Sequence, residues 1–253
     1  MIIDANGYWG RWGIRVPGIN DPDEFLRTMD NFQIDKAAIC SLKSLCHNTI
    51  EGNNEILDCL KYAPDRFIGV GVINPHDTVR SVETELQRLL DGGISALRLY
   101  PGFYRFKLSD EPLLRPITEW AEKHRMPIYV TAGILPGTLY DPVPIEDEVR
   151  EFARANLNLQ IVLSGVQVFP LIGLIRLLRE THNTFIEIST YQGCEGVRLL
   201  SAIAGPNRVL MGTAYGLWHP SVGIGKVQMA NISDEARKLI LGTNAKRLFR
   251  IKE

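Results

Sequence analysis

The sequence is short of cysteine motifs, long hydrophobic runs and net charge. No two of its four cysteines have CxxC spacing, which excludes the common zinc-binding patterns, and a chain of this size needs no disulfide scaffold. We therefore expect reduced, mostly buried thiols. No stretch approaches the roughly 20 apolar residues that a membrane-spanning helix needs. The formal net charge of −1 gives no electrostatic reason to expect nucleic acid or an anionic membrane as a partner.

The chain also has no recognisable leader or internal linker. A strand-like segment begins at Ile2, which leaves no room for a secretory signal peptide, and no Gly/Ser-rich or low-complexity tract interrupts the 253 residues. A hydrophobic content of 45% with 23% charged residues is typical of a globular protein with a sizeable core. We predict a cytoplasmic protein in which residues 1–253 form one domain.

Eight short apolar segments alternate with helical patterns along the chain. The segments that we predict to be strands are 2–5, 36–41, 67–73, 96–100, 128–131, 160–164, 184–189 and 209–212. In 78–90 apolar residues recur at steps of three and four, which predicts a helix with Asp77 as N-cap and an end at Gly92. Asp21 followed by Pro22 predicts the start of an earlier helix.

Continuous apolar strands that alternate with helices favour a parallel sheet whose outer face is covered by helices. Eight such units in about 250 residues predict an α/β fold of the (β/α)8 TIM-barrel type. In this architecture the functional site lies at the carboxyl ends of the strands. Alternation along the strands then selects the side chains that face the barrel axis. They are Arg98, Tyr100, Tyr129, Thr131, Glu187 and Ser189.

In order and spacing, several segments resemble the amidohydrolase-2 branch of the amidohydrolase superfamily, the metal-dependent TIM-barrel hydrolases and decarboxylases. They are Ile-Asp at 3–4, Asn-Glu at 54–55, YAPDRFIG at 62–69, Asn-Pro at 74–75, GISALRLYP at 93–101, Pro-Ile at 127–128, RVLMGT at 208–213 and LGTNAKRLF at 241–249. The resemblance runs through nearly the whole chain. It implies an amidohydrolase-type barrel and a hydrolase-like ancestry.

The resemblance also implies a set of metal ligands, and this sequence lacks them. The family uses two histidines on its first strand, histidines at the ends of strands 5 and 6, and an aspartate at the end of strand 8. The residues at those positions here are Asn6, Tyr8, Thr131, Gly165 and Ala214. These side chains offer at most weak neutral oxygens, whereas zinc and manganese need imidazole, thiolate or carboxylate donors. We therefore predict no catalytic metal and no other cofactor.

Arg98 is the leading candidate for ligand binding, because a guanidinium forms bidentate contacts with a carboxylate or phosphate. Its structural alternative is an internal ion pair with Glu187 or Asp4. Glu187 is also a candidate acid–base group if burial raises its pKa. Two loop histidines are further catalytic candidates: His219 follows segment 209–212 and His76 follows 67–73, although a lone loop histidine is often a surface residue. His47, in the loop after segment 36–41, is a weaker one.

Aromatic residues gather at the predicted strand ends and suggest a pocket for a planar or apolar acid, although core packing explains part of the pattern. They are Tyr8, Trp9, Trp12, Tyr100, Phe103, Tyr104, Tyr215 and Trp218. The candidate substrate-binding residues are Asn6, Tyr8, Arg98, Tyr100, Thr131, Thr213, Tyr215 and Trp218.

Three functions remain open at this point. The first is a non-catalytic protein that binds a small anionic, carboxylate-bearing ligand, or that acts as a partner subunit of an active relative. The second is a metal-independent hydrolase, lactonase or decarboxylase that holds a carboxylate with Arg98 and uses His219, His76 or Glu187 as acid–base. The third is a metal-dependent hydrolase with unconventional ligands. The expected partner is a small molecule, and a homo-oligomer is a further prediction.

Overall fold

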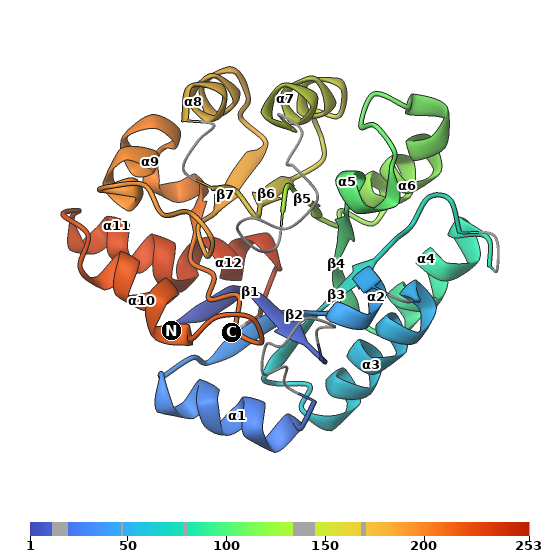
Figure 1. The fold of residues 1–253 in the computed structure, drawn as a ribbon, viewed down its shortest axis with the longest axis horizontal. Helices are drawn as coiled ribbons and strands as arrows, with labels where there is room; N and C mark the ends of the chain where they lie inside the picture. Colours follow the sequence, from blue (N-terminus) through green and yellow to red (C-terminus); the bar gives the residue numbers. More distant parts are fainter. Residues whose placement is uncertain (12–19, 47, 78–79, 134–144, 168–170, 253) are drawn as a thin grey trace.

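The computed structural model describes residues 1–11, 20–46, 48–77, 80–133, 145–167 and 171–252. Eight parallel strands pair in sequence order and stand at the centre of a ring of helices (Figure 1). The strands are β1 (Ile3–Trp9), β2 (Lys36–Ser41), β3 (Phe67–Val72), β4 (Ile94–Leu99), β5 (Ile128–Thr131), β6 (Ile161–Ser164), β7 (Thr184–Glu187) and β8 (Val209–Leu210). Neighbouring strands are consecutive in the chain, as βα units require.

Backbone hydrogen bonds join β1 to the segment that follows β8 and so close the sheet. Ala5 N donates to Met211 O at 2.9 Å, and Ala214 N donates to Asn6 O at 2.7 Å. Tyr8 N continues this contact with a 2.7 Å bond to Tyr215 O. The predicted (β/α)8 TIM barrel is therefore confirmed.

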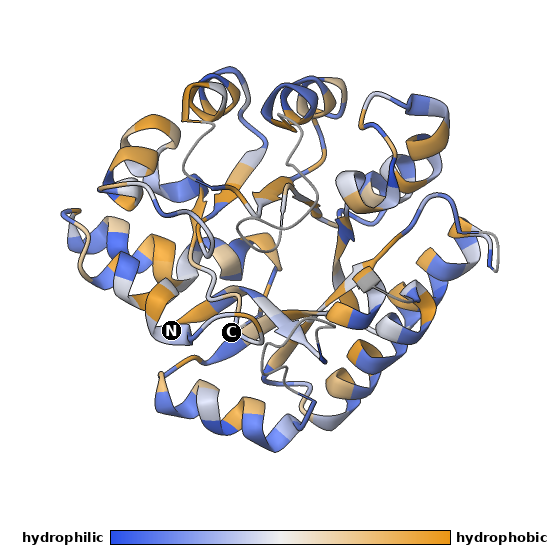
Figure 2. Ribbon diagram, viewed as in Figure 1, coloured by the Kyte–Doolittle hydropathy of each residue, from blue (hydrophilic) through white to orange (hydrophobic). Residues whose placement is uncertain are grey.

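Helices cover the outside of the barrel, and in Figure 2 they alternate apolar and polar residues around mostly apolar strands. The helices are α1 (Pro22–Asn31), α2 (Leu42–Cys46), α3 (Thr49–Tyr62), α4 (Val82–Asp91), α5 (Pro101–Tyr104), α6 (Glu111–Lys123), α7 (Ile145–Ala155), α8 (Leu171–Glu180), α9 (Gly196–Ala204), α10 (Pro220–Gln228), α11 (Asp234–Lys238) and α12 (Asn244–Leu248), with a 3-10 turn at Pro206–Arg208 and a π-helical turn at Leu239–Thr243. None of the described helices is long and apolar enough to cross a membrane.

The sheet separates two apolar clusters. Leu97 and Leu99 pack outward against the helices, whereas Tyr100 and Tyr129 belong to the cluster inside the barrel. The alternation read from the sequence is thus confirmed at β4 and β5. Of the cysteines whose side chains are described, Cys40 and Cys59 are buried, Cys194 is exposed, and all three are free thiols.

Several strand bounds differ from the sequence prediction: β4 begins at Ile94 and not at 96, β7 ends at Glu187 and not at 189, and the ends of β1 and β8 also differ. β1 continues past residue 5 to Trp9, across an irregularity in its pairing with β2 between Asp4 and Gly7. Asn6 and Gly7 have low strand propensity, but pairing on both sides of β1 overrides it. β8 ends at Leu210: the N–H of the next residue, Met211, donates to Ile240 O, while its carbonyl still accepts from Ala5 N of β1.

The helix predicted over 78–90 begins later than expected. Its N-cap is Ser81, whose hydroxyl accepts from Thr84 N, and its C-cap is Gly92 as predicted. Asp77 as N-cap was wrong, because its carboxylate accepts a hydrogen bond from Thr49 Oγ1 instead. The predicted start at Asp21 and Pro22 is confirmed: the Asp21 side chain accepts from Asp23 N at 2.9 Å.

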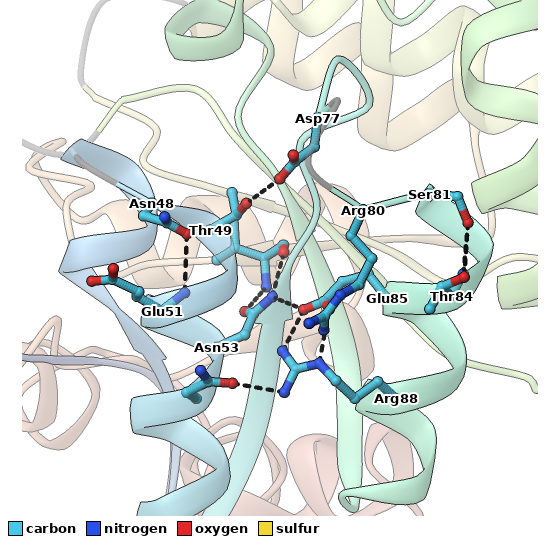
Figure 3. A network of polar contacts seen from close by, with 12 residues as sticks. Asn48, Thr49, Glu51, Asn53, Asp77, Arg80, Ser81, Thr84, Glu85 and Arg88 are labelled. Atoms are coloured by element: carbon cyan, nitrogen blue, oxygen red, sulfur yellow. Dashed lines mark hydrogen bonds and ion pairs between the residues drawn. The ribbon is translucent and has the colours of Figure 1, made fainter.

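A buried amide on α3 fixes the end of β3 (Figure 3). Asn53 donates to Val72 O at 2.9 Å and accepts from Val72 N at 2.8 Å, as a neighbouring strand would. Its Nδ2 also donates to Glu85, which in turn accepts from Arg80 and Arg88. The network ties β3, α3 and α4 together.

Replacing Asn53 with alanine is expected to lower the free energy of unfolding by about 2 kcal/mol, because both backbone groups of Val72 lose their partner in a buried site. Urea denaturation measures the change. Asn54→Ala is the matched control, since Asn54 is exposed and only accepts from Arg88. Equal effects of the two substitutions would contradict the role of Asn53.

Candidate functional site

Arg98 lies on the barrel axis and is 1% exposed. Its Nη1 donates to Tyr8 Oη at 3.0 Å, and its Nη2 donates to Asn6 Oδ1 at 2.8 Å. Both acceptors come from β1, across the barrel from β4. The two positions that stand in place of the strand 1 histidines therefore hold a guanidinium.

Three tyrosine rings surround the Arg98 guanidinium. Its carbon lies 4.7 Å from the Tyr129 ring centre, 5.4 Å from that of Tyr8 and 6.0 Å from that of Tyr100, within the range of cation–π attraction. Burial raises the pKa of Tyr8 to about 12, so its phenol is neutral at physiological pH. Tyr8 and Tyr100 are themselves fully buried. They enclose the cation and do not form the wall of an open pocket.

Asn6 separates Arg98 from Glu187. While Oδ1 of the amide accepts from Arg98, its Nδ2 donates to Glu187 Oε2 at 2.8 Å. No ion pair joins Arg98 directly to Glu187 or Asp4 among the described residues. The predicted internal ion pair was therefore wrong, because the neutral side-chain amide of Asn6 lies between Arg98 and Glu187 and hydrogen-bonds to both.

Glu187 is fully buried at the end of β7. Burial raises its pKa to about 7, and the nearby charge of Asp4 acts in the same direction. The backbone N and Oγ of Ser189 both donate to the carboxylate and, with the charge of Arg98, lower that pKa in part. A carboxyl group of this kind changes its protonation state near neutral pH, which suits a general acid or base.

Asp4 and Thr131 support the site from opposite sides. Asp4 accepts from Thr213 N and Asn6 N, each at 2.9 Å, and from the Thr213 hydroxyl. Burial raises the pKa of this carboxyl. Thr131 Oγ1 shares a 2.9 Å hydrogen bond with Ser164 Oγ between the ends of β5 and β6. The structure thus places Thr213 and Thr131 as hydrogen-bond partners of other strand ends.

Two buried N–H groups of side chains have no acceptor among the described residues: Nε–H of Arg98 and Nε1–H of Trp218. Trp218 is partly exposed and packs against the apolar cluster inside the barrel, the cluster that contains Tyr8 and Tyr100. A buried donor without a partner costs about 1–3 kcal/mol. Two such donors at one end of the barrel favour an occupant that supplies acceptor oxygens.

The remaining candidates lie apart from Arg98. His219 is exposed, shares a 2.7 Å hydrogen bond with Ser221 Oγ and packs edge-on against Phe32. His76 is exposed and packs against Phe106. The hydroxyl of Tyr215 shares a hydrogen bond with Thr28 of α1, outside the barrel. The structure therefore does not bring the two histidines to Glu187. His47 and Trp12 fall outside the described residues.

Cys40 belongs to the site although the sequence did not single it out. Its Sγ lies 3.6 Å from Tyr100 Oη inside the barrel, and burial raises the pKa of the thiol. The alternation of segment 36–41 points Cys40 inward, the same signal that identified Arg98. The carboxyl ends of β1, β2, β4 and β7 thus supply one continuous polar cluster.

A parallel barrel with its polar cluster at the carboxyl ends of the strands defines the TIM-barrel class of proteins. A family model described as Amidohydrolase matches residues 10–251. The chain therefore belongs to the amidohydrolase family. The match begins one residue after β1, so Asn6 and Tyr8 lie outside it. Comparison with curated protein sequences gives no significant match.

Three solved structures illustrate the fold. An uncharacterised TIM-barrel protein from Bordetella bronchiseptica is 18% identical, with a TM-score of 0.77 and 98% of each chain covered. The 5-carboxyvanillate decarboxylase of Sphingomonas paucimobilis is 15% identical, with a TM-score of 0.76 over 99% of each chain. The Novosphingobium aromaticivorans enzyme of that name, complexed with manganese and 4-hydroxy-3-methoxy-5-nitrobenzoic acid, is 15% identical with a TM-score of 0.74, over 99% of this chain and 96% of that one.

The side chains present here do not fit a divalent metal ion. In the described part of the chain, no three His, Cys, Asp or Glu side chains are grouped to hold one. Asn6 and Tyr8 face the guanidinium, whose charge repels a second cation. Gly165 has a φ of +74°, and a Cβ there would lie 2.0 Å from Gly133 O. At that position the backbone itself leaves no space for a ligating side chain.

Proposed function

We propose that this protein binds a small carboxylate-bearing ligand at the carboxyl end of the barrel, and that Arg98 takes the role of the cation there in place of a metal. The unpartnered Nε of Arg98 and Nε1 of Trp218 carry the proposal. A carboxylate supplies two oxygens with several lone pairs, which can accept from both donors. Binding of this kind requires no turnover, so the proposal holds for a non-catalytic protein as well as for an enzyme.

The polar cluster is neutral overall when Arg98 and Asp4 are charged and Glu187 is protonated. A protonated Glu187 carries no charge. A ligand carboxylate that enters beside it is therefore attracted by the positive charge of Arg98 and is not repelled by Glu187. The partly exposed Trp218 offers flat apolar surface for the body of the ligand. The solved decarboxylases named above act on or hold aromatic carboxylates, which supports an aromatic acid as ligand.

Arg98 is 1% exposed, so entry of a ligand requires a side chain of the inner cluster to move. Trp218 packs against that cluster, is partly exposed and has an unpartnered Nε1–H. In chelator, 4-hydroxy-3-methoxy-5-nitrobenzoate and 5-carboxyvanillate are expected to raise the Tm by several degrees, and their methyl esters to raise it less.

Trp218→Phe keeps the ring and removes Nε1–H, so the Kd is expected to rise about tenfold, measured by calorimetry.

Trp120→Phe is the matched control, because Trp120 lies on α6 against His124 and away from the barrel interior. A thermal shift that appears only with added manganese would contradict binding without metal. Near-stoichiometric zinc or manganese in the purified protein would do the same. Equal ligand affinity in Trp218→Phe and wild type would remove Trp218 from the site.

A second function is favoured by one observation, the pKa of about 7 at Glu187. In a decarboxylation without metal, Arg98 would hold the substrate and a protonated Glu187 would give its proton to the carbon that CO2 leaves, while the bonding pair stays on that carbon. Glu187 then regains a proton from water. Product analysis in chelator tests this function: turnover should occur in wild type and be lost in Glu187→Gln. Assembly as a homo-oligomer, or with an active relative, stays a prediction.

A further inference from the structure

A cavity lies outside the barrel, between the turn that follows β7, the first turn of α9 and the second half of α10. Its volume is about 460 Å³. Lys226, Arg198 and Gln192 contribute polar groups to its wall, and Tyr191 and Met229 contribute apolar surface. The Met229 side chain is 88% exposed. None of these residues contacts Arg98, so the cavity is separate from the proposed carboxylate site.

Lys226 is the charged group that distinguishes this cavity. Its Nζ donates to Ile188 O at 3.1 Å and to Ser189 O at 2.6 Å. It is part-buried and forms no ion pair with any described carboxylate. Burial lowers the pKa of Lys226, although the charge of Glu187 opposes this. A half-desolvated ammonium without a counter-ion is costly, and an anion beside it offsets the cost.

The rest of the wall does not neutralise Lys226. Arg198 is paired with Glu195, so that pair contributes no net charge. The two carbonyl groups leave one N–H of the Lys226 ammonium for a further acceptor. The backbone also holds the lysine in place: Gly223, one turn earlier on α10, lies so close to the segment after β8 that a Cβ would lie 2.2 Å from Gly212 O. The positive charge therefore stays at the cavity wall.

We infer that this cavity is a second ligand site, which binds a small organic anion with an apolar body. The Lys226 ammonium binds the anionic head, and the apolar body packs against Tyr191 and Met229. The site does not depend on the proposed function of the barrel interior. The cavity does adjoin the barrel interior through Ser189. The carbonyl of Ser189 accepts from Lys226 Nζ, and its N and Oγ donate to Glu187.

The probe is hexanoate, with hexanol as its neutral counterpart and inorganic phosphate as a head group without an apolar body. The chain has five methionines, so methyl-13C labelling gives a simple spectrum in which Met229→Leu assigns the Met229 signal. Hexanoate is expected to shift this signal with saturation, and phosphate to shift it more weakly. Lys226→Gln is expected to weaken hexanoate binding at least tenfold, and Lys226→Arg to keep it within a few-fold.

Lys238→Gln is the matched control, because Lys238 is an exposed lysine on the adjacent helix α11. Unchanged hexanoate affinity in Lys226→Gln would overturn the inference, and so would an equal response to hexanol. Loss of the Met229 response in Arg98→Lys but not in Lys226→Gln would assign hexanoate to the barrel interior and also overturn it. A normal Met229 response without any thermal shift by aromatic carboxylates would contradict only the proposed function.

Discussion

Replacing Arg98 with leucine is expected to abolish stabilisation by carboxylates and to lower the free energy of unfolding by about 3–5 kcal/mol. The substitution removes the donors to Asn6 Oδ1 and Tyr8 Oη in a fully buried site. It also leaves Asp4 and Glu187 without the cation that offsets their charge. Urea denaturation, with and without 5-carboxyvanillate, measures both effects.

Arg98→Lys separates ligand binding from folding. Lysine keeps the positive charge but loses the planar fork and Nε–H, so the protein should fold while the ligand Kd rises by at least tenfold. Arg115→Lys is the matched control: Arg115 is exposed on α6 and paired with Glu111, and its replacement should change neither stability nor binding appreciably. Carboxylate stabilisation that survives in Arg98→Leu would disprove the proposed site.

The protein is expected to become less stable as the pH rises from 4.5 past 7, because of Glu187. Its pKa is about 7 in the folded protein, against 4.5 as the ordinary value, so the folded state holds a proton that the unfolded state has released. The contribution is fully present below pH 4.5 and is lost as the pH passes 7. One pH unit per proton corresponds to about 1.4 kcal/mol, which makes the loss about 3 kcal/mol.

Urea denaturation from pH 4.5 to 8 in wild type and Glu187→Gln measures this contribution as the difference between the two pH slopes. Asp4 leaves a residual slope of the same sign in the variant, because burial raises its pKa too. Glu119→Gln on α6 is the control, since Glu119 is exposed. Parallel pH curves for wild type and Glu187→Gln would contradict the raised pKa of Glu187.

The sequence predicted which side chains point into the barrel better than it predicted which of them are in direct contact. Alternation within short parallel strands placed Arg98, Tyr100 and Glu187 inside the barrel, because the direction of a side chain follows from the period of the strand. It could not predict that Asn6 stands between Arg98 and Glu187, since contact distances depend on strand register and on the irregularity in β1. The predicted ion pair failed for that reason.

Residues outside the strands were harder to predict. His219 and His76 follow strands, but a loop has no period that fixes where a side chain points, and both are exposed. Asp77 and Ser81 are both good N-cap residues, and a contact with Thr49, distant in sequence, decided between them. Lys226 lies on a helix whose sequence gave no reason to look at it, because its significance comes from the carbonyl groups of Ile188 and Ser189.

The close approach of Gly165 to Gly133 limits how this barrel could be engineered. A barrel that carries histidine at position 165 needs a different path for the ends of β5 and β6, because here the backbone of Gly133 fills the space of any side chain at that position. Gly165→His alone would break the local backbone before it supplied a ligand. Installing a metal site in this barrel would therefore require the ends of β5 and β6 to be rebuilt before a ligand is added at position 165.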